Sequence, residues 1–110
     1  MELKKHMLGD VTVITLDGSL DTSTAPGVQE DLELLLPDKG TTVFDLSKMS
    51  YMSSAGLRLL LLAYRRASRS GSRVALAHVP PEVREIMSTT GFLDFFTVTD
   101  TIEAGMEALA

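Results

Sequence analysis

Apolar and polar residues alternate along the first part of the chain, as they do in half-buried β-strands. Between residues 3 and 20, Val11, Val13 (or Ile14) and Leu16 alternate with polar residues, which is the period of two expected for a strand. Gly9-Asp10 interrupts this stretch with residues that favour a tight turn. The pattern therefore predicts two strands joined by a hairpin turn.

The rest of the chain alternates between strand-like and helix-like patterns. Short segments rich in β-branched, apolar or aromatic side chains predict further strands over residues 41–47, 73–79 and, more weakly, 95–99. Apolar residues at helical spacing predict helices over residues 21–36, 53–71, 80–91 and 100–110. Suitable helix-start residues precede the first helix (Thr22, Ser23 or Thr24) and the last (Asp100, with Glu103 at capping-box spacing).

The predicted order of elements is β-β-α-β-α-β-α-(β)-α. Strands that alternate with helices favour a mostly parallel or mixed sheet with helices packed against it. A chain of 110 residues suits one domain with one core. We therefore expect a single α/β domain over residues 1–110, with a small mixed β-sheet packed against about four helices.

Composition excludes several classes of function. The chain has no cysteine, so it forms no disulfide and no cysteine-type zinc site. A formal net charge of -5 disfavours a nucleic-acid partner. The chain opens without a basic and then apolar leader, and its longest apolar run, 59–64, is too short to cross a bilayer. We expect a cytoplasmic protein without a membrane partner.

The charge is unevenly distributed along the chain. Residues 46–81 contain no acidic residue but six basic ones, whereas four basic and fifteen acidic residues elsewhere give that remainder a net charge of -11. Such a basic segment fits either a solvated helix face or a surface that meets an acidic partner or a phosphate. The basic residues of this segment are Lys48, Arg58, Arg65, Arg66, Arg69 and Arg73.

Two serines and a glycine stand where the second predicted helix begins, in the sequence YMSSAGLRLLL. A serine hydroxyl there can accept a backbone N–H that lacks an intrahelical partner, which contributes on the order of 1 kcal/mol. Alternatively, the hydroxyl accepts a phosphoryl group, whose charge the free N–H groups and the positive end of the helix dipole accommodate. On this second interpretation, Gly56 has no side chain that would project from the surface, so another protein can approach closely.

A catalytic role for these serines is disfavoured. The window Met52-Ser53-Ser54-Ala55-Gly56 lacks the first glycine of a G-x-S-x-G nucleophile elbow. Hydrolases of that type follow the chain order serine, acid, histidine, but no acidic residue lies between Ser54 and His78. His6 and His78 are isolated and have no metal-ligand spacing around them. We therefore predict no catalytic residue, no metal site and no cofactor, and hence no enzyme.

The second predicted helix is amphipathic, with two exceptions. At 100° per residue, an apolar stripe predicts the core-facing side: Leu57, Leu60, Leu61, Tyr64 and Ala67. The arginines lie on the opposite side, where Leu59 and Leu62 flank Arg66. The two leucines form either a small partner-binding patch beside the serines or a surface that a neighbouring segment covers.

The segment DLSKMSYMSSAGLRLLL resembles the signature stretch of STAS domains, in particular of bacterial anti-sigma factor antagonists. GSLDTSTAPGVQEDL and TGFLDFFTVTDTIEAGMEAL resemble the family's first helix region and its C-terminal end, so the resemblance covers nearly the whole chain. It implies a small mixed sheet with helices, and a binding protein that is not an enzyme. It also implies two partners, an anti-sigma factor that is a serine kinase and a PP2C-type, metal-dependent phosphatase.

Many members of the family have an aspartate, two hydroxyl residues and a glycine at the start of this helix. Here those positions read Ser53, Ser54, Ala55 and Gly56, so the resemblance implies phosphorylation of Ser54, with Ser53 as second choice. Asp21 matches a family position near the phosphorylation site, although a helix cap also explains it. Asp45 matches the aspartate that ends the signature strand, and we expect it to hold the turn by hydrogen bonds.

The favoured hypothesis is an anti-sigma factor antagonist that releases a sigma factor and is switched off by phosphorylation. Its predicted partner-binding residues are Asp21, Ser53, Ser54, Gly56, Arg58, Leu59, Leu62 and Arg66. The alternative is a STAS module of a lipid-transport or signalling-scaffold assembly, which needs no kinase.

Overall fold

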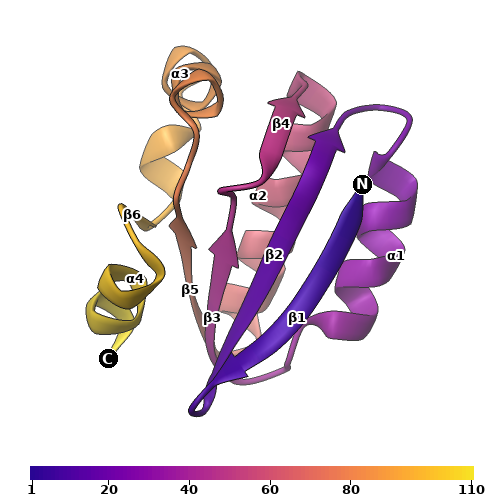
Figure 1. Ribbon diagram of the computed structural model, residues 1–110. Coiled ribbons are helices and arrows are strands. Elements are labelled where there is room, and N and C mark those ends of the chain that lie inside the picture. Colours follow the sequence, from indigo (N-terminus) through magenta and orange to yellow (C-terminus); the bar gives the residue numbers. More distant parts are fainter.

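Four helices and a six-stranded mixed sheet make up the chain (Figure 1). The computed structural model describes residues 1–110. The strands are β1 (Glu2–Leu8), β2 (Val11–Leu20), β3 (Gly40–Asp45), β4 (Met49–Met52), β5 (Ser72–Ala77) and β6 (Val98–Thr99). The helices are α1 (Ala25–Leu35), α2 (Ser54–Arg69), α3 (Pro81–Thr89) and α4 (Ile102–Leu109), and a short 3-10 helix spans Leu93–Phe95. The predicted fold class is confirmed.

The first two strands form the predicted hairpin, and the remaining pairs are parallel. β1 pairs antiparallel with β2, and Gly9 takes a positive φ of 62° in the turn between them. The sheet order is β1-β2-β3-β5-β6, while β4 pairs with the end of β2 beyond an irregularity at Gly18 and Ser19. Because β3 pairs with the first half of β2 and β4 with its last residues, both lie along the same edge of β2.

Alternate residues of the central strands face two different layers of helices. Ile14, Phe44 and Leu76 are fully buried in the main core, which α1 and α2 cover from one side (Figure 1). Val43 faces the other side, where its methyl carbons lie 3.4 Å from the place that a Cβ on Gly105 of α4 would occupy. The alternation of strand side chains therefore places the serine-bearing helix α2 opposite α4.

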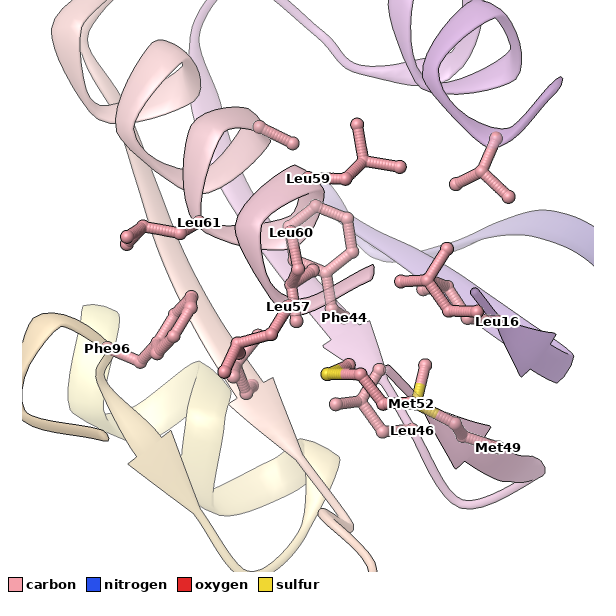
Figure 2. Packing of buried hydrophobic residues seen from close by; sticks show 14 of the residues in the cluster. Leu16, Phe44, Leu46, Met49, Met52, Leu57, Leu59, Leu60, Leu61 and Phe96 are labelled. Carbon is pink, nitrogen blue, oxygen red and sulfur yellow. The ribbon is translucent and has the colours of Figure 1, made fainter. Parts of the chain in front are cut away.

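The main core is built around the apolar stripe of α2. Figure 2 shows Leu57 and Leu60 directed toward Phe44 and Met52 of the sheet, and all four side chains are fully buried. Phe96 packs its ring edge-on against Tyr64, with the ring centroids 4.9 Å apart. The predicted core face of this helix is confirmed, and it fixes which side of α2 is turned outward.

Some elements differ from the sequence-based prediction by more than a shift of their ends. β4 is an additional strand that the sequence pattern did not separate from the turn, because four residues are too few to show alternation. Of the weak strand predicted over 95–99, only Val98–Thr99 pairs with β5. The last helix is capped by Thr101, whose hydroxyl accepts the Ala104 N–H at 3.0 Å, and not by Asp100. None of the four helices combines the length and the apolar character that a membrane-spanning helix requires.

Candidate functional site

The first turn of α2 is attached to the end of β2. The backbone N–H of Ser53 donates to the Leu20 carbonyl at 2.9 Å, and the Ser53 hydroxyl accepts the Gly56 N–H at 3.1 Å. Ser53 is therefore the N-cap of the helix, as the first interpretation of the serine pair predicted. Its hydroxyl is half-buried and already engaged.

Ser54 is the first residue of α2 and is exposed to solvent. Its hydroxyl makes no hydrogen bond within the protein, in contrast to that of Ser53. The first turn of the helix contains no acidic side chain, so no carboxylate on α2 occupies the positive end of the helix dipole. Of the two serines, Ser54 has the accessible and unengaged hydroxyl.

Gly56 does not form part of the exposed surface, contrary to the prediction that it lets a partner approach. It is buried, and a Cβ at this position would collide with the Leu20 carbonyl oxygen and lie 2.8 Å from the Leu20 Cγ. The missing side chain allows close packing of α2 on β2 within the protein. Gly56 thus contributes to the site indirectly, because it allows the first turn of α2 to pack on β2.

Asp21 lies next to this junction because it directly follows Leu20. Its Oδ1 accepts the Ser23 N–H at 2.9 Å, the Ser23 hydroxyl at 2.7 Å and the Thr24 N–H at 3.1 Å. The bond from the Ser23 hydroxyl, followed by that from the Thr24 N–H, lowers the pKa of the Asp21 carboxyl. The half-buried Asp21 is therefore a well-positioned carboxylate at the surface, beside the start of α2.

Thr24, one of the three residues predicted to cap the first helix, orders the turn between β2 and α1 without capping the helix with its side chain. It is the residue before α1, but its side chain accepts no N–H from the helix. Its hydroxyl instead donates to the Ser19 carbonyl at 2.9 Å and accepts the Asp21 N–H at 3.0 Å. Asp21 and Thr24 thus satisfy each other's backbone N–H groups, which orders the segment between β2 and α1.

Leu59 and Leu62 do not form one exposed patch. Leu59 is only 9% exposed, whereas Leu62 is 60% exposed, and Figure 2 shows Leu59 on the side of α2 that faces α1. The sequence left open whether Leu59 belongs to a partner-binding patch or is covered by a neighbouring segment. The second interpretation applies, since α1 covers this side chain. Leu62 alone remains available as an apolar contact.

A groove of about 130 Å³ runs between α1 and α2. Its lining includes Leu32 of α1, Leu36 directly after this helix, and Leu59 and Leu62 from α2. Arg66 lies on its rim and pairs with Glu33 of α1, with Nη1 and Oε1 3.5 Å apart. The α1 side of this groove was not found from the sequence, since no local pattern shows which helix lies beside α2.

The outer face of α2 is basic along its whole length. Arg58, Arg65 and Arg69 are exposed and take part in no ion pair, because the Arg66–Glu33 pair is the one salt bridge of the protein. Since these residues are four, eleven and fifteen positions after Ser54, they lie on the same outward side as that residue. Four of the six basic residues of the segment therefore lie on α2, and three of them form an exposed face on the side of Ser54, whereas Lys48 and Arg73 lie outside this helix.

Two other sequence predictions concern residues outside this surface. Asp45 has its predicted turn-holding role, because its carboxylate accepts the Ser47 N–H at 3.0 Å and the Thr15 hydroxyl at 3.4 Å. His6 and His78 are both exposed, and His78 has a positive φ of 54°. No group of three His, Asp or Glu side chains is placed to hold a metal ion.

Comparison with known proteins agrees with this architecture. The family model described as STAS domain matches residues 2–105. The chain is 31% identical to a protein of Bordetella bronchiseptica named as the anti-sigma factor antagonist BtrV, over 98% of this chain and 94% of that protein. Because the family model spans nearly all of the chain, it establishes the family by itself.

Two solved structures have the same fold. An anti-sigma factor antagonist from Mycobacterium paratuberculosis gives a TM-score of 0.80 at 23% identity, with 98% of this chain and 92% of that one covered. SpoIIAA from Bacillus in its phosphorylated form gives a TM-score of 0.67 at 19% identity, with 99% and 100% covered. Sequence and fold lead to the same assignment, and the chain belongs to the STAS domain family.

Proposed function

We propose that this chain is an anti-sigma factor antagonist whose binding is switched off by phosphorylation of Ser54. The observation that carries the proposal is the exposed, unengaged Ser54 hydroxyl at the start of α2, beside the carboxylate of Asp21. The similarity to the protein named BtrV supports the anti-sigma factor as the partner class. The chain acts by binding and performs no catalysis of its own.

Ser54 is a better acceptor than Ser53 for a geometric reason. A kinase needs a hydroxyl that can enter its active site, and the Ser53 hydroxyl is half-buried and bonded to the Gly56 N–H. Adding a phosphoryl group to Ser53 would remove a helix cap, whereas adding it to Ser54 leaves that cap in place. The remaining N–H groups of the first turn and the helix dipole favour the added negative charge.

The partner-binding surface surrounds Ser54 and faces outward. Asp21, which follows the β2 residue bonded to Ser53, supplies a negative charge, and Arg58, one helical turn after Ser54, supplies a positive one. Leu62 supplies an exposed apolar contact further along α2. Arg66 borders the same surface at the groove, and Ser53 lies at its inner edge. Gly56 and Leu59 do not contact the partner directly. They contribute by packing α2 against β2 and α1, respectively.

Phosphorylation would change this surface without unfolding the domain. A phosphoserine carries about -1.5 to -2 charges at neutral pH, and docking would bury that charge against the partner. A loss of ~3 kcal/mol in binding free energy would weaken the complex by more than a hundredfold. We infer that the anti-sigma factor is itself the serine kinase, and that a PP2C-type phosphatase restores the binding form.

The test is phosphorylation of the full chain by the cell's purified anti-sigma kinases with ATP, followed by mass spectrometry of the Ser53-Ser54 peptide. We expect a gain of about 80 Da, one phosphate, in the parent and in Ser53→Ala, but none in Ser54→Ala. Ser54→Ala should bind the anti-sigma factor as the parent does, and Ser54→Asp should bind more weakly. Equal affinity of Ser54→Asp and the parent would contradict the proposal.

A further inference from the structure

Ser54 and Arg58 are separated by one turn of α2 and face the same way. Both residues are exposed, while Gly56 and Leu57 between them are buried. Side chains at positions i and i+4 of a helix have Cβ atoms about 5–6 Å apart. A group attached to the Ser54 oxygen would therefore lie within reach of the Arg58 guanidinium.

Arg58 has no competing partner within the protein. It makes no hydrogen bond or ion pair, in contrast to Arg66, which pairs with Glu33. The first turn of α2 contains no acidic side chain. The nearby Asp21 carboxylate already uses its Oδ1 to accept three hydrogen bonds from Ser23 and Thr24. The guanidinium is thus an exposed, unpaired cation one helical turn from the modification site.

We propose that Arg58 binds the phosphoryl group of phosphorylated Ser54 in an ion pair within α2. This inference rests on the proposed function, which makes Ser54 the acceptor. The order of the charges is the favourable one, because an anion four residues before a cation also agrees with the helix dipole. A guanidinium can donate two parallel hydrogen bonds to phosphate oxygens, which gives the pair a defined geometry.

The ion pair gives phosphorylation a second effect on binding. In the unmodified protein Arg58 is available to an acidic group on the anti-sigma factor. In the phosphorylated protein the same guanidinium is held by the phosphate on its own helix. The modification therefore adds negative charge to the contact surface and also withdraws a cation from it.

No other basic residue of the segment is placed to take this role. Arg65 is eleven residues after Ser54, which corresponds to about 16 Å along the helix axis. Lys48 precedes β4, and its carbonyl accepts the Gly18 N–H at 3.1 Å. The extended strand β4 separates it from α2, at about 3.3 Å per residue. Among the basic residues of this segment, only Arg58 lies one helical turn away from the phosphoryl group on Ser54.

The test uses the full chain with phosphoserine installed at position 54 by genetic code expansion, so that no kinase or partner is needed. The second pKa of the phosphate is measured by ³¹P NMR in the parent, in Arg58→Gln and in Arg65→Gln. We expect Arg58→Gln to raise this pKa by about 0.4, since the pair favours the dianion. Arg65→Gln removes the same charge further along the same face and should change the pKa by less than about 0.1.

Arg58→Lys provides a further check, because a lysine keeps the charge but loses the forked geometry. Its phosphate pKa should fall between those of the parent and Arg58→Gln. The inference is overturned if Arg58→Gln leaves the phosphate pKa unchanged, or if Arg65→Gln raises it equally. A failed kinase reaction at Ser54 would count against the proposed function but would not alter this titration, so the two failures are distinguishable.

Discussion

Gly56 of α2 packs directly on the backbone of Leu20, the last residue of β2. A Cβ at position 56 would collide with the Leu20 carbonyl oxygen, and the same oxygen accepts the Ser53 N–H at 2.9 Å. One carbonyl group therefore fixes the start of α2 against the end of β2. Because Asp21 follows Leu20, this contact also places the carboxylate beside the two serines.

Replacing Gly56 with alanine should destabilise the domain. The added methyl group has no space above the Leu20 carbonyl, and overpacking of this kind costs about 1–3 kcal/mol. Urea unfolding should show this loss in the free energy of unfolding. Gly27→Ala is the matched control, because Gly27 lies in α1 with nothing within 4 Å of its Cβ position and should gain about 0.5 kcal/mol from helix propensity. Equal stability of Gly56→Ala and the parent would contradict the close packing.

Two buried threonines should respond in opposite ways to replacement by valine. The Thr42 hydroxyl is buried without a hydrogen-bond partner, so Thr42→Val should raise the free energy of unfolding by about 1 kcal/mol. The Thr15 hydroxyl donates to Asp45 Oδ2 at 3.4 Å, so Thr15→Val should lower it by about 1 kcal/mol. Thermal unfolding of both variants measures the difference. If the free energy of unfolding changed in the same direction in both variants, the hydrogen bonding of the two hydroxyl groups would not explain the changes.

His78 has a backbone conformation that glycine adopts more easily. Its φ of 54° lies in the left-handed region, which costs a residue with a Cβ about 1 kcal/mol. His78→Gly should therefore raise the free energy of unfolding by about 1 kcal/mol in a urea titration. His78→Ala keeps a Cβ and should bring no such gain. Equal gains in both variants would point to the imidazole and not to the backbone.

Stability should fall at acidic pH partly through Asp21. Its pKa is lowered in the folded protein, mainly by the Ser23 hydroxyl and then by the Thr24 N–H. A carboxyl with a lowered folded pKa stabilises the protein above its unfolded pKa, and this contribution is lost as the pH falls through the folded value. Asp21→Asn should thus be less stable than the parent at pH 7, and the difference should shrink below about pH 4. A difference that is constant from pH 7 to pH 2 would exclude this role of the carboxylate.

Leu62 should contribute to binding of the anti-sigma factor, unlike another exposed leucine. Truncation of an apolar contact residue within an interface costs at least about 1 kcal/mol when that residue is important. Leu62→Ser is therefore expected to weaken binding about fivefold to tenfold in calorimetry. Leu34 on α1 is 84% exposed and does not line the groove, so Leu34→Ser should bind as the parent does. Unchanged affinity of Leu62→Ser would remove this residue from the partner-binding surface.

The sequence patterns that succeeded were those that depend on local physics. The hairpin at Gly9 and the apolar stripe of α2 were predicted because alternation and helical periodicity reflect which side of a single element is buried. The Ser53 cap was predicted because a helix start leaves backbone N–H groups without partners. The serine pair and its position at the start of the helix were therefore evident without coordinates.

The predictions that failed concern contacts between distant segments. Gly56 is buried against β2 and not exposed as expected, and for Leu59 the covered alternative holds because α1 lies beside it. No spacing within α2 indicates either neighbour. β4 was missed since its pairing with β2 depends on an irregularity at Gly18 and Ser19 in another part of the chain.

By itself, the sequence determined the order of elements, the core side of α2 and the hydroxyl at its start, since each follows from neighbouring residues. Only the tertiary structure decided which of the two serines has an unengaged hydroxyl, which backbone contact holds Asp21 near them, and that α1 forms one wall of the groove. These features depend on packing of β2 and α1 against α2, and packing between distant segments follows from the shape of the whole core.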